Sequence, residues 1–219
     1  MLLVFDLDGT LVDSVRDLAE AASELVTQLG GRTLAVAEVS RMVGDGAAAL
    51  VRRALEAAGV AADSPDALAR FLEIYERRLL DHTRPYEGVP EALAYASTRG
   101  RLAVLTNKPT RPALAVLEGL GLDGFFHDVI GGDGPFPRKP DPTGLRALQL
   151  AAPGQPTLLV GDSPADADTA RAAGVGFAFA SYGFGAVRFD HPPVTPWVLE
   201  RPSDLPAVLE RFAAVNTGC

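Results

Sequence analysis

The sequence has almost no cysteine, since the single one among its 219 residues is Cys219, the last residue. One cysteine cannot form a disulfide within the chain, which excludes the small secreted domains that disulfides hold together. We expect this thiol to be simply exposed. With 47% hydrophobic and 22% charged residues, the composition is typical of a globular protein with a sizeable core.

Basic residues are also scarce relative to acidic ones. The chain has 20 lysines and arginines against 28 aspartates and glutamates, which gives a formal net charge of -8. A broad nucleic-acid interface needs clustered lysine and arginine, so we expect no nucleic-acid partner. An acidic chain binds an anionic ligand only where a metal cation or well-placed basic side chains reverse the local field.

Long hydrophobic runs are missing as well. No stretch of the sequence approaches the roughly 20 apolar residues that span a bilayer. The start of the chain lacks the basic residues and the long apolar run of a signal peptide. We therefore expect no membrane partner and a cytoplasmic protein.

The sequence does contain a series of short apolar runs, each stopped by glycine or polar residues. Such runs are typical of strands buried on both faces of a parallel sheet. Helical signals lie between them, and together they predict a doubly wound, Rossmann-like α/β fold. The predicted strands are 2–5, 101–105, 127–130, 157–160 and 175–180. The predicted helices between and after them run from Pro90 to near Gly100, over 111–119, 142–151 and 164–173, and over 203–214 from a Ser203 cap.

One segment breaks this alternation. From Asp13 to about Arg84 the sequence contains no good strand. It contains instead three predicted helices, at 14–29, roughly 45–58 and 65–83. An all-helical segment between the first strand and its partners predicts an inserted cap domain at 14–84, which leaves 1–13 and 85–219 as the α/β core domain.

Polar side chains follow the predicted strands, where ligands of parallel α/β sheets bind. Asp6 and Asp8 follow the first strand, and residues two apart on an extended chain can face one cavity. Two carboxylates this close ionise together only with a cation between them, and oxygen ligands suit Mg²⁺. The alternative is a strand end with two solvent-exposed acids.

Later strands are followed by further candidates. The loop that begins with Thr106 could bind phosphate oxygens through its hydroxyl and backbone amides, or it is an ordinary polar loop. Lys139 precedes a proline, which restricts its backbone, and could supply positive charge to a phosphoryl group, or it is a surface lysine. Asp162 could be a metal ligand. Ser163 and Asp166 have the spacing of a capping box, which is compatible with a place near the metal.

In this order, the four groups resemble the motifs of the haloacid dehalogenase superfamily of phosphotransferases, and the resemblance covers nearly the whole chain. The helical insertion resembles the cap of that superfamily. The four motif-like segments are 6–14 (DLDGTLVDS), 105–109 (LTNKP), 138–142 (RKPDP) and 160–166 (VGDSPAD). Within the superfamily, the phosphoglycolate phosphatases are most similar, on segments 43–46, 85–89 and 106–109.

The resemblance implies a Mg²⁺-dependent phosphatase that hydrolyses a small phosphomonoester, best matched by 2-phosphoglycolate, through an aspartyl-phosphate. It implies that Asp6 is the nucleophile and that Asp8 is the general acid and then the general base. Dehalogenases of the superfamily lack an acid at the position of Asp8, because a halide leaves without a proton. The second aspartate therefore favours phosphate chemistry.

The resemblance also assigns the binding residues. It implies that Mg²⁺ is held by the side chains of Asp6 and Asp162 and by the backbone carbonyl of Asp8, supported by Asp166. It implies that the phosphoryl oxygens are bound by Thr106, Asn107 and Lys139. In the cap, Arg16, Asp45 and Arg52 could contact the rest of the substrate or belong to a solvated helix face. We expect a small phosphorylated metabolite as the partner, and a monomer or homodimer.

Two alternatives stay open at this point. A phosphosugar mutase of the same superfamily would carry the same motifs and pass the phosphoryl group to a sugar. A non-catalytic receiver-like domain would also accept phosphate on an aspartate, but it has no use for the insertion after the first strand. The segment 188–201 matches none of the motifs, and the three histidines, His82, His127 and His191, lack metal-ligand spacing.

Overall fold

The computed structural model describes residues 1–61 and 64–216, so Cys219 and part of the loop expected at 59–64 lie outside the described residues. In this part of the chain, a six-stranded sheet has the strand order β5-β4-β1-β6-β7-β8, and every neighbouring pair in it is parallel. The predicted Rossmann-like α/β fold is thus confirmed. The strands are β1 Leu2–Phe5, β4 Arg101–Leu105, β5 Asp128–Ile130, β6 Thr157–Gly161, β7 Gly176–Ala180 and β8 Trp197–Leu199.

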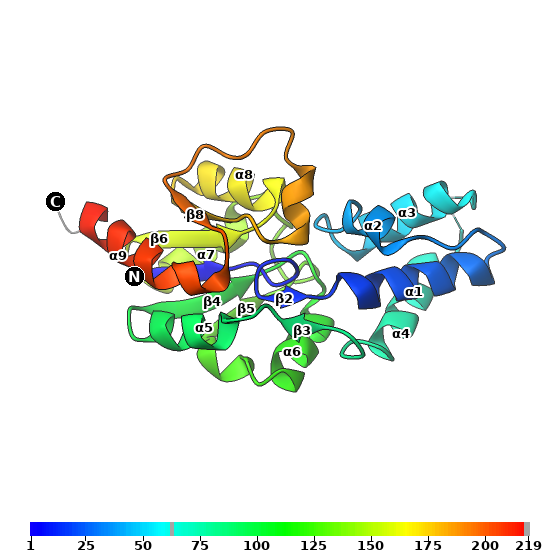
Figure 1. Ribbon diagram of the computed structural model, residues 1–219, viewed down its shortest axis with the longest axis horizontal. Coiled ribbons are helices and arrows are strands. Elements are labelled where there is room, and N and C mark those ends of the chain that lie inside the picture. The colour runs from blue at the N-terminus through cyan, green and yellow to red at the C-terminus, as the bar shows by residue number, and fades with distance from the viewer. Residues whose placement is uncertain (62–63, 217–219) are drawn as a thin grey trace.

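Helices cover both faces of this sheet (Figure 1). Side chains of a strand alternate between its faces. Leu3 and Phe5 accordingly pack into one core with α5, α6 and α9, whereas Leu2 and Val4 pack into another with α7 and α8. These helices are α5 Val89–Ser97, α6 Thr110–Gly119, α7 Thr143–Leu150, α8 Pro164–Ala173 and α9 Leu205–Asn216.

The segment between β1 and α5 is helical, as predicted, and forms what we call the helical block, residues 15–76. It has a hydrophobic core of its own, which contains Leu25, Leu55 and Phe71, and it lies at the opposite end of β1 from the N-terminus (Figure 1). Its helices are α1 Val15–Gln28, α2 Val36–Ser40, α3 Ala47–Ala58 and α4 Ala67–Glu76. The short helix α2 was not predicted.

The two connections to the helical block run side by side. Val12–Asp13 (β2) pairs antiparallel with Arg84–Pro85 (β3). Beside this pair, the buried carboxylate of Asp17 accepts hydrogen bonds from the backbone N–H groups of His82 and Thr83 at 2.7–3.0 Å. Because these amides bind a side chain, they cannot continue a helix.

One predicted boundary was wrong here. The helix predicted at 65–83 ends at Glu76, turns follow over 77–81, and the contacts with Asp17 keep His82 and Thr83 out of any helix. A second boundary was wrong at the other end of the chain. Ser203 does not cap α9, because it lies inside a 3₁₀ turn, η3 Pro202–Asp204. Asp204 instead accepts the backbone N–H groups of Glu200 and Arg201.

A further 3₁₀ helix, η2 Phe184–Arg188, follows β7, and another, η1 Asp123–Phe125, precedes β5. The segment 188–201, which matched no motif, begins at the last residue of η2 and contains β8. Neither of these elements was predicted. Among the described residues, no helix is both long enough and apolar enough to cross a lipid bilayer.

Candidate active site

Most candidate residues lie at or just beyond the carboxyl ends of three adjacent strands, and Lys139 lies on the loop between β5 and α7. Phe5 at the end of β1 pairs with Val104 of β4 and Val160 of β6. Asp6 is the residue directly after Phe5. Thr106 and Asp162 each lie two residues after the partner of Phe5 on the neighbouring strand. The register of the sheet thus brings together residues that are up to about 150 positions apart in the chain.

Three carboxylates form the centre of the site. Oxygen atoms of Asp6, Asp162 and Asp166 lie within 4.8 Å of one another, and all three residues are buried. Burial and the charges of the other two acids raise the pKa of Asp162 well above its ordinary value. Burial raises the pKa of Asp6 to about 6, and the nearby Asp166 adds to this, although Lys139 opposes it.

One cation already neutralises part of this charge. The ammonium of Lys139 lies 2.8 Å from Asp6 Oδ1 and 2.6 Å from Asp166 Oδ1. Burial alone would lower the pKa of Lys139, but the charges of the two acids outweigh burial and raise it. A single lysine leaves three buried carboxylates undercompensated, and the donor set consists of oxygen only. Those residues fit a hard divalent cation such as Mg²⁺.

The loops close tightly around Asp162. Its oxygens accept hydrogen bonds from Thr10 Oγ1 at 3.0 Å and from the backbone N–H of Gly185 at 2.7 Å. Gly9 passes so close, with φ of +92°, that a Cβ there would lie 2.1 Å from Asp162 Oδ2. Only glycine fits at that position, so the glycine of the first motif makes room for the acid of the fourth.

Asp166 takes part in the predicted capping box and also binds Lys139, while its place near a metal stays a prediction. Its Oδ2 accepts hydrogen bonds from the backbone N–H of Ser163 at 3.0 Å and from Ser163 Oγ at 2.6 Å, so it takes part in the cap of α8. Its Oδ1 binds Lys139. The helix terminus and the charged centre are therefore held by the two oxygens of one side chain.

The carboxylate of Asp8 is separate from the three-acid centre. It accepts a hydrogen bond from Ser14 Oγ at 2.6 Å, and Lys108 Nζ lies 3.0 and 3.2 Å from its two oxygens. The two acids of the first motif thus have different cationic partners, Lys139 for Asp6 and Lys108 for Asp8. The two carboxylates therefore lie in different electrostatic surroundings.

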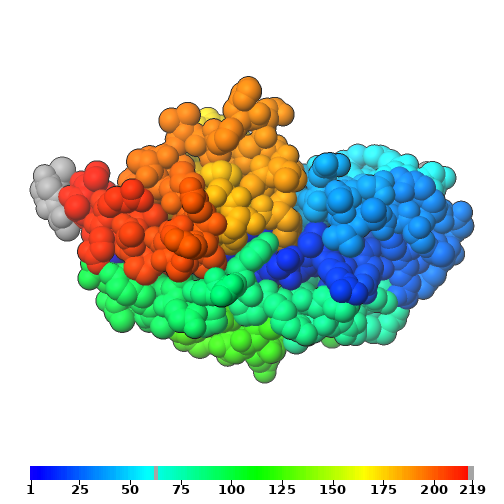
Figure 2. Space-filling view, in the orientation of Figure 1, coloured from blue at the N-terminus to red at the C-terminus, as the bar shows by residue number. Residues whose placement is uncertain are grey.

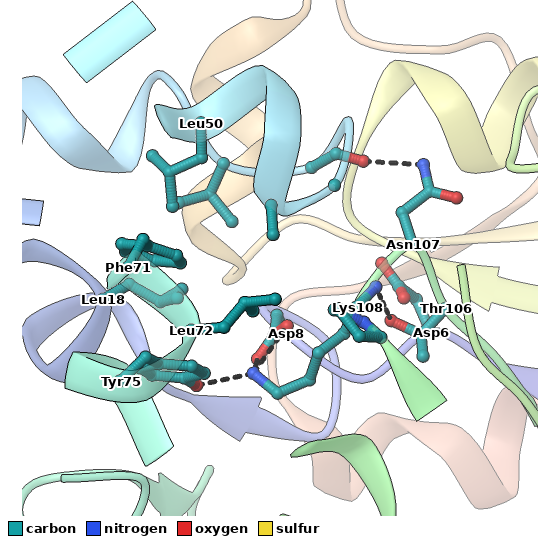
Figure 3. Close-up of a pocket in the computed structure, with 15 residues that line it drawn as sticks. Asp6, Asp8, Leu18, Leu50, Phe71, Leu72, Tyr75, Thr106, Asn107 and Lys108 are labelled. Atoms are coloured by element: carbon teal, nitrogen blue, oxygen red, sulfur yellow. Dashed lines mark hydrogen bonds and ion pairs between the residues drawn. The ribbon is translucent and has the colours of Figure 1, made fainter. Parts of the chain in front are cut away.

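Lys108 is the site residue that sequence reasoning missed. Its side chain is only 3% exposed, and its ammonium lies between Asp8 and the hydroxyl of Tyr75 on α4, as Figure 3 shows. Burial alone would lower the pKa of Lys108, but the charge of Asp8 and the contact with Tyr75 raise it. Burial also raises the pKa of Tyr75 to about 12. The position of Lys108 next to Thr106 and Asn107 was visible in the sequence, but its partner on α4 was not.

Thr106 and Asn107 lie where predicted, with different freedom to bind a ligand. Thr106 Oγ1 accepts the backbone N–H of Lys108 at 3.2 Å, so its own proton remains available. Asn107 Nδ2 donates to the carbonyls of Gly44 at 2.9 Å and Lys139 at 3.0 Å. With both amide protons engaged, the side chain of Asn107 joins the helical block to the Lys139 loop, and its part in phosphate binding stays a prediction.

A cavity of about 40 Å³ separates the strand ends from the helical block (Figure 3). The strand ends contribute polar groups to it, from Asp6, Asp8 and the loop 106–108. The helical block contributes a mostly apolar wall. That wall consists of Leu18, Val43, Gly44, Gly46, Ala47, Leu50, Phe71, Leu72 and Tyr75.

The three suggested cap contacts do not line this cavity. Arg16 and Arg52 are exposed and pair with Glu20 and Glu56 one helical turn away, which is the solvated-face alternative. Asp45 instead binds Arg188 Nη2 at 2.6 Å and also contacts Arg53.

The helix η2 connects the centre to the helical block. Gly185 at its start binds Asp162, while Arg188 at its end donates to the carbonyl of Val43 at 2.8 Å and to Asp45. In Figure 2 this segment, in orange, lies directly against the blue helical block. The segment that matched no motif in the sequence therefore forms a bridge across the site.

Comparison with known proteins gives consistent likenesses. A family model described as haloacid dehalogenase-like hydrolase matches residues 1–174. Phosphoglycolate phosphatase of Rhodospirillum rubrum is 46% identical over 192 residues, which cover 83% of this chain and 80% of that protein. Phosphoglycolate phosphatase of Cereibacter sphaeroides is 36% identical over 220 residues, which cover 97% and 99%. The crystal structure of a predicted phosphoglycolate phosphatase from Haemophilus somnus superimposes with a TM-score of 0.86 at 29% identity, covering 94% and 96%.

Proposed function

Because the chain belongs to the haloacid dehalogenase-like hydrolases and is a phosphoric monoester hydrolase, we propose that it hydrolyses 2-phosphoglycolate through an aspartyl-phosphate on Asp6. The observation that carries this proposal is the position of Asp6. Its carboxylate ends the central strand, binds the buried Lys139, and lies within 4.8 Å of the Asp162 and Asp166 oxygens.

The proposed reaction has two steps. An oxygen of Asp6 attacks phosphorus, the bond from phosphorus to the leaving oxygen breaks, and Asp8 gives its proton to that oxygen. Water then attacks the aspartyl-phosphate, Asp8 accepts a proton from the water, and inorganic phosphate leaves the restored Asp6. The hydrogen bonds from Ser14 and Lys108 to Asp8 support this role, because they hold its carboxylate at the cavity.

Three residues are proposed to bind the phosphoryl oxygens. Lys139 supplies positive charge beside Asp6, where negative charge accumulates during the transfer. Thr106 supplies the proton of its hydroxyl, which its contact with the Lys108 amide leaves free. Asn107 is assigned a backbone N–H contact, since its side-chain amide is engaged elsewhere.

Mg²⁺ is the proposed cofactor. We assign it to the side chains of Asp6 and Asp162 and to the backbone carbonyl of Asp8, with Asp166 in support. The fit rests on the three buried carboxylates, which one lysine does not neutralise. When bound, the ion supplies positive charge that offsets the repulsion between these carboxylates and an anionic ester.

The segment 14–84 is proposed to act as a cap domain over a core of 1–13 and 85–219. Its separate hydrophobic core and the apolar wall that it gives the cavity support this division. A cap that closes over the strand ends would exclude bulk water while phosphorus is attacked. A cytoplasmic location and a monomer or homodimer remain predictions.

The test is phosphate release from a panel of esters, with Mg²⁺ and with a chelator. The panel contains 2-phosphoglycolate, hexose phosphates, nucleotides and pyrophosphate. We expect Mg²⁺-dependent release with a marked preference for 2-phosphoglycolate. A preference for another ester would overturn the substrate but keep the chemistry. Isomerisation of a sugar phosphate with a bisphosphate activator would instead point to the mutase alternative.

The intermediate has its own test. Borohydride reduces an acyl phosphate but leaves a free carboxylate intact, so rapid quenching of the working enzyme should convert Asp6 to homoserine, detectable by peptide mass spectrometry. The Asp6→Asn variant is the control and should show neither turnover nor this product. Turnover without any modification of residue 6 would contradict the aspartyl-phosphate.

A further inference from the structure

We propose that Lys108 and Tyr75 together bind a second negative group of the substrate, so that the enzyme selects small phosphomonoesters carrying a carboxylate next to the ester. This inference rests on the proposed function and deepens it, because it names the residues that recognise the part of the substrate other than the phosphate. These two residues come from different parts of the chain, the loop after β4 and helix α4.

The two side chains have hydrogen-bond donors to offer. An ammonium has three N–H groups, and Lys108 directs them at the two Asp8 oxygens and the Tyr75 hydroxyl. The contact with Asp8 Oδ2, at 3.2 Å, is the longer of the two to Asp8, and it is the one that a substrate carboxylate would replace or share. Within residues 1–61 and 64–216, the Tyr75 hydroxyl accepts from Lys108 and donates to no acceptor, so its O–H is free. Both residues line the cavity.

Away from the strand ends, the described residues that line the cavity include no other side chain that could bind an anion. Among the described residues that line it, Lys108 is the single cation, and the helical block contributes mainly aliphatic and aromatic side chains. Sugar hydroxyls placed against this wall would lose their hydrogen bonds to water without replacement, which is unfavourable. A compact carboxylate would instead meet a lysine and a tyrosine hydroxyl.

The position relative to the reacting atoms fits a two-carbon acid. Asp8 is the residue proposed to protonate the leaving oxygen, and Lys108 Nζ lies 3.0 Å from Asp8 Oδ1. In an ester of a 2-hydroxy acid, a single carbon separates the leaving oxygen from the carboxylate. When the leaving oxygen reaches Asp8, the carboxylate therefore lies beside Lys108. The cavity of about 40 Å³ holds few water-sized molecules, which also favours a compact group.

A simpler role for Lys108 is to neutralise Asp8 alone. The two roles differ in their effect on an ester that has no carboxylate. A lysine that serves only Asp8 matters equally for two alkyl esters whose leaving oxygens both need a proton, whereas a lysine that binds a carboxylate matters more for the ester that has one. The ratio between two substrates therefore separates the roles, even if Asp8 is disturbed in the variant.

The experiment compares kcat/KM for 2-phosphoglycolate and 2-hydroxyethyl phosphate, in which a hydroxymethyl group replaces the carboxylate. The full chain is used with Mg²⁺. We expect the wild type to prefer the carboxylate by about 10²-fold or more, since a site built for a charged partner rejects the analogue that lacks it. Lys108→Met should reduce this ratio to below ~10, and Tyr75→Phe, which keeps the ring, should reduce it several-fold, mainly through KM.

Arg52→Met is the matched control. Arg52 is exposed and pairs only with Glu56 among the described residues, so losing its charge should leave the ratio unchanged. Equal kcat/KM for the two esters in the wild type, or an unchanged ratio in both Lys108→Met and Tyr75→Phe, would overturn the inference while leaving the phosphatase intact. No phosphate release from either ester in the wild type would overturn the proposed substrate as well.

Discussion

Lys139 Nζ lies 2.8 Å from Asp6 Oδ1, and both side chains are less than 10% exposed. This ion pair joins the end of the central strand to a loop 133 positions later in the chain. Lys139 also binds Asp166, so the proposed nucleophile and the cap of α8 share one cation. The stability of the loops and the chemistry of the site therefore depend on the same charge.

Replacing Lys139 by methionine should damage both properties. Two buried carboxylates would lose their cation, which typically costs about 3–5 kcal/mol. Phosphate release should fall by ~10³-fold or more, since the transferred group loses its stabilising charge. Urea unfolding and steady-state assays measure the two effects. Lys139→Arg retains the charge and should recover stability better than activity, because a planar guanidinium does not replace an ammonium. A methionine variant within tenfold of wild-type turnover would contradict the assignment.

Asp8→Asn should slow turnover of alkyl esters by ~10²-fold or more, because the leaving oxygen loses its proton donor. The loss in kcat/KM should be smaller for p-nitrophenyl phosphate, whose leaving group departs without a proton. Mg²⁺ binding should be largely intact, since the proposed contact is the backbone carbonyl of Asp8. Titration by calorimetry measures that binding. Turnover like that of the wild type on 2-phosphoglycolate would rule out the acid and base role.

Mg²⁺ should stabilise the folded protein measurably. At 100 times its dissociation constant, a ligand that binds only the native state adds about 2.7 kcal/mol, which for a chain of this size raises the melting temperature by about 5–10 °C. Asp162→Asn should diminish this increase. It should also make the chelator-treated protein at least as stable as the wild type, because it removes one of three crowded carboxylates.

Asp168→Asn is the matched control for that comparison. Asp168 lies on α8 close to the site in sequence, but it is exposed and pairs with Arg171. Replacing Asp168 should leave the increase in melting temperature caused by Mg²⁺ as large as in the wild type. Differential scanning calorimetry with and without chelator gives both values. An Asp162→Asn variant that responds to Mg²⁺ as strongly as the Asp168→Asn variant would exclude Asp162 as a ligand.

The ion pairs of Asp45 with Arg188 and Arg53 should make the free energy of unfolding depend on pH. Burial alone would raise the pKa of Asp45, but Arg188 and Arg53 outweigh burial and lower it. A carboxylate with a lowered folded pKa contributes stability above its unfolded pKa of about 4, and this contribution is lost as pH falls through the folded pKa.

The wild type should therefore exceed Asp45→Asn in stability at neutral pH, by about 1 kcal/mol or less for a partly exposed ion pair. The difference should shrink below about pH 4. Urea unfolding of both proteins at several pH values measures it. A difference that stays constant from neutral pH into the acid range would mean that the arginines do not act on the charge of Asp45.

The strand ends could be predicted because each depends on local sequence. Asp6, Thr106 and Asp162 all follow short apolar runs, and the strand order of a parallel sheet places such ends at one edge. Gly9 belongs to the first motif-like segment, but its contact with Asp162 could not be predicted from local sequence, because the two residues are 153 positions apart.

The residues that were missed depend on contacts between distant elements. Lys108 becomes a buried site residue only because α4 brings Tyr75 against it. Arg188 becomes a bridge only because the loop at Asp45 lies opposite. The helix predicted to reach residue 83 cannot include His82 and Thr83, because Asp17, on another helix, binds their amides. In each case the local sequence favours more than one structure, and a distant partner decides between them.

The pairing of β2 with β3 has a consequence for how such a protein can change over time. The chain leaves the sheet at Val12–Asp13 and returns beside the same point at Arg84–Pro85. Everything between these residues can be lengthened, reshaped or exchanged for other helices without moving the ends that join it to the sheet. The acids at the strand ends would keep their positions throughout. The helices that wall the cavity can therefore change while the chain keeps the sheet that carries the acids.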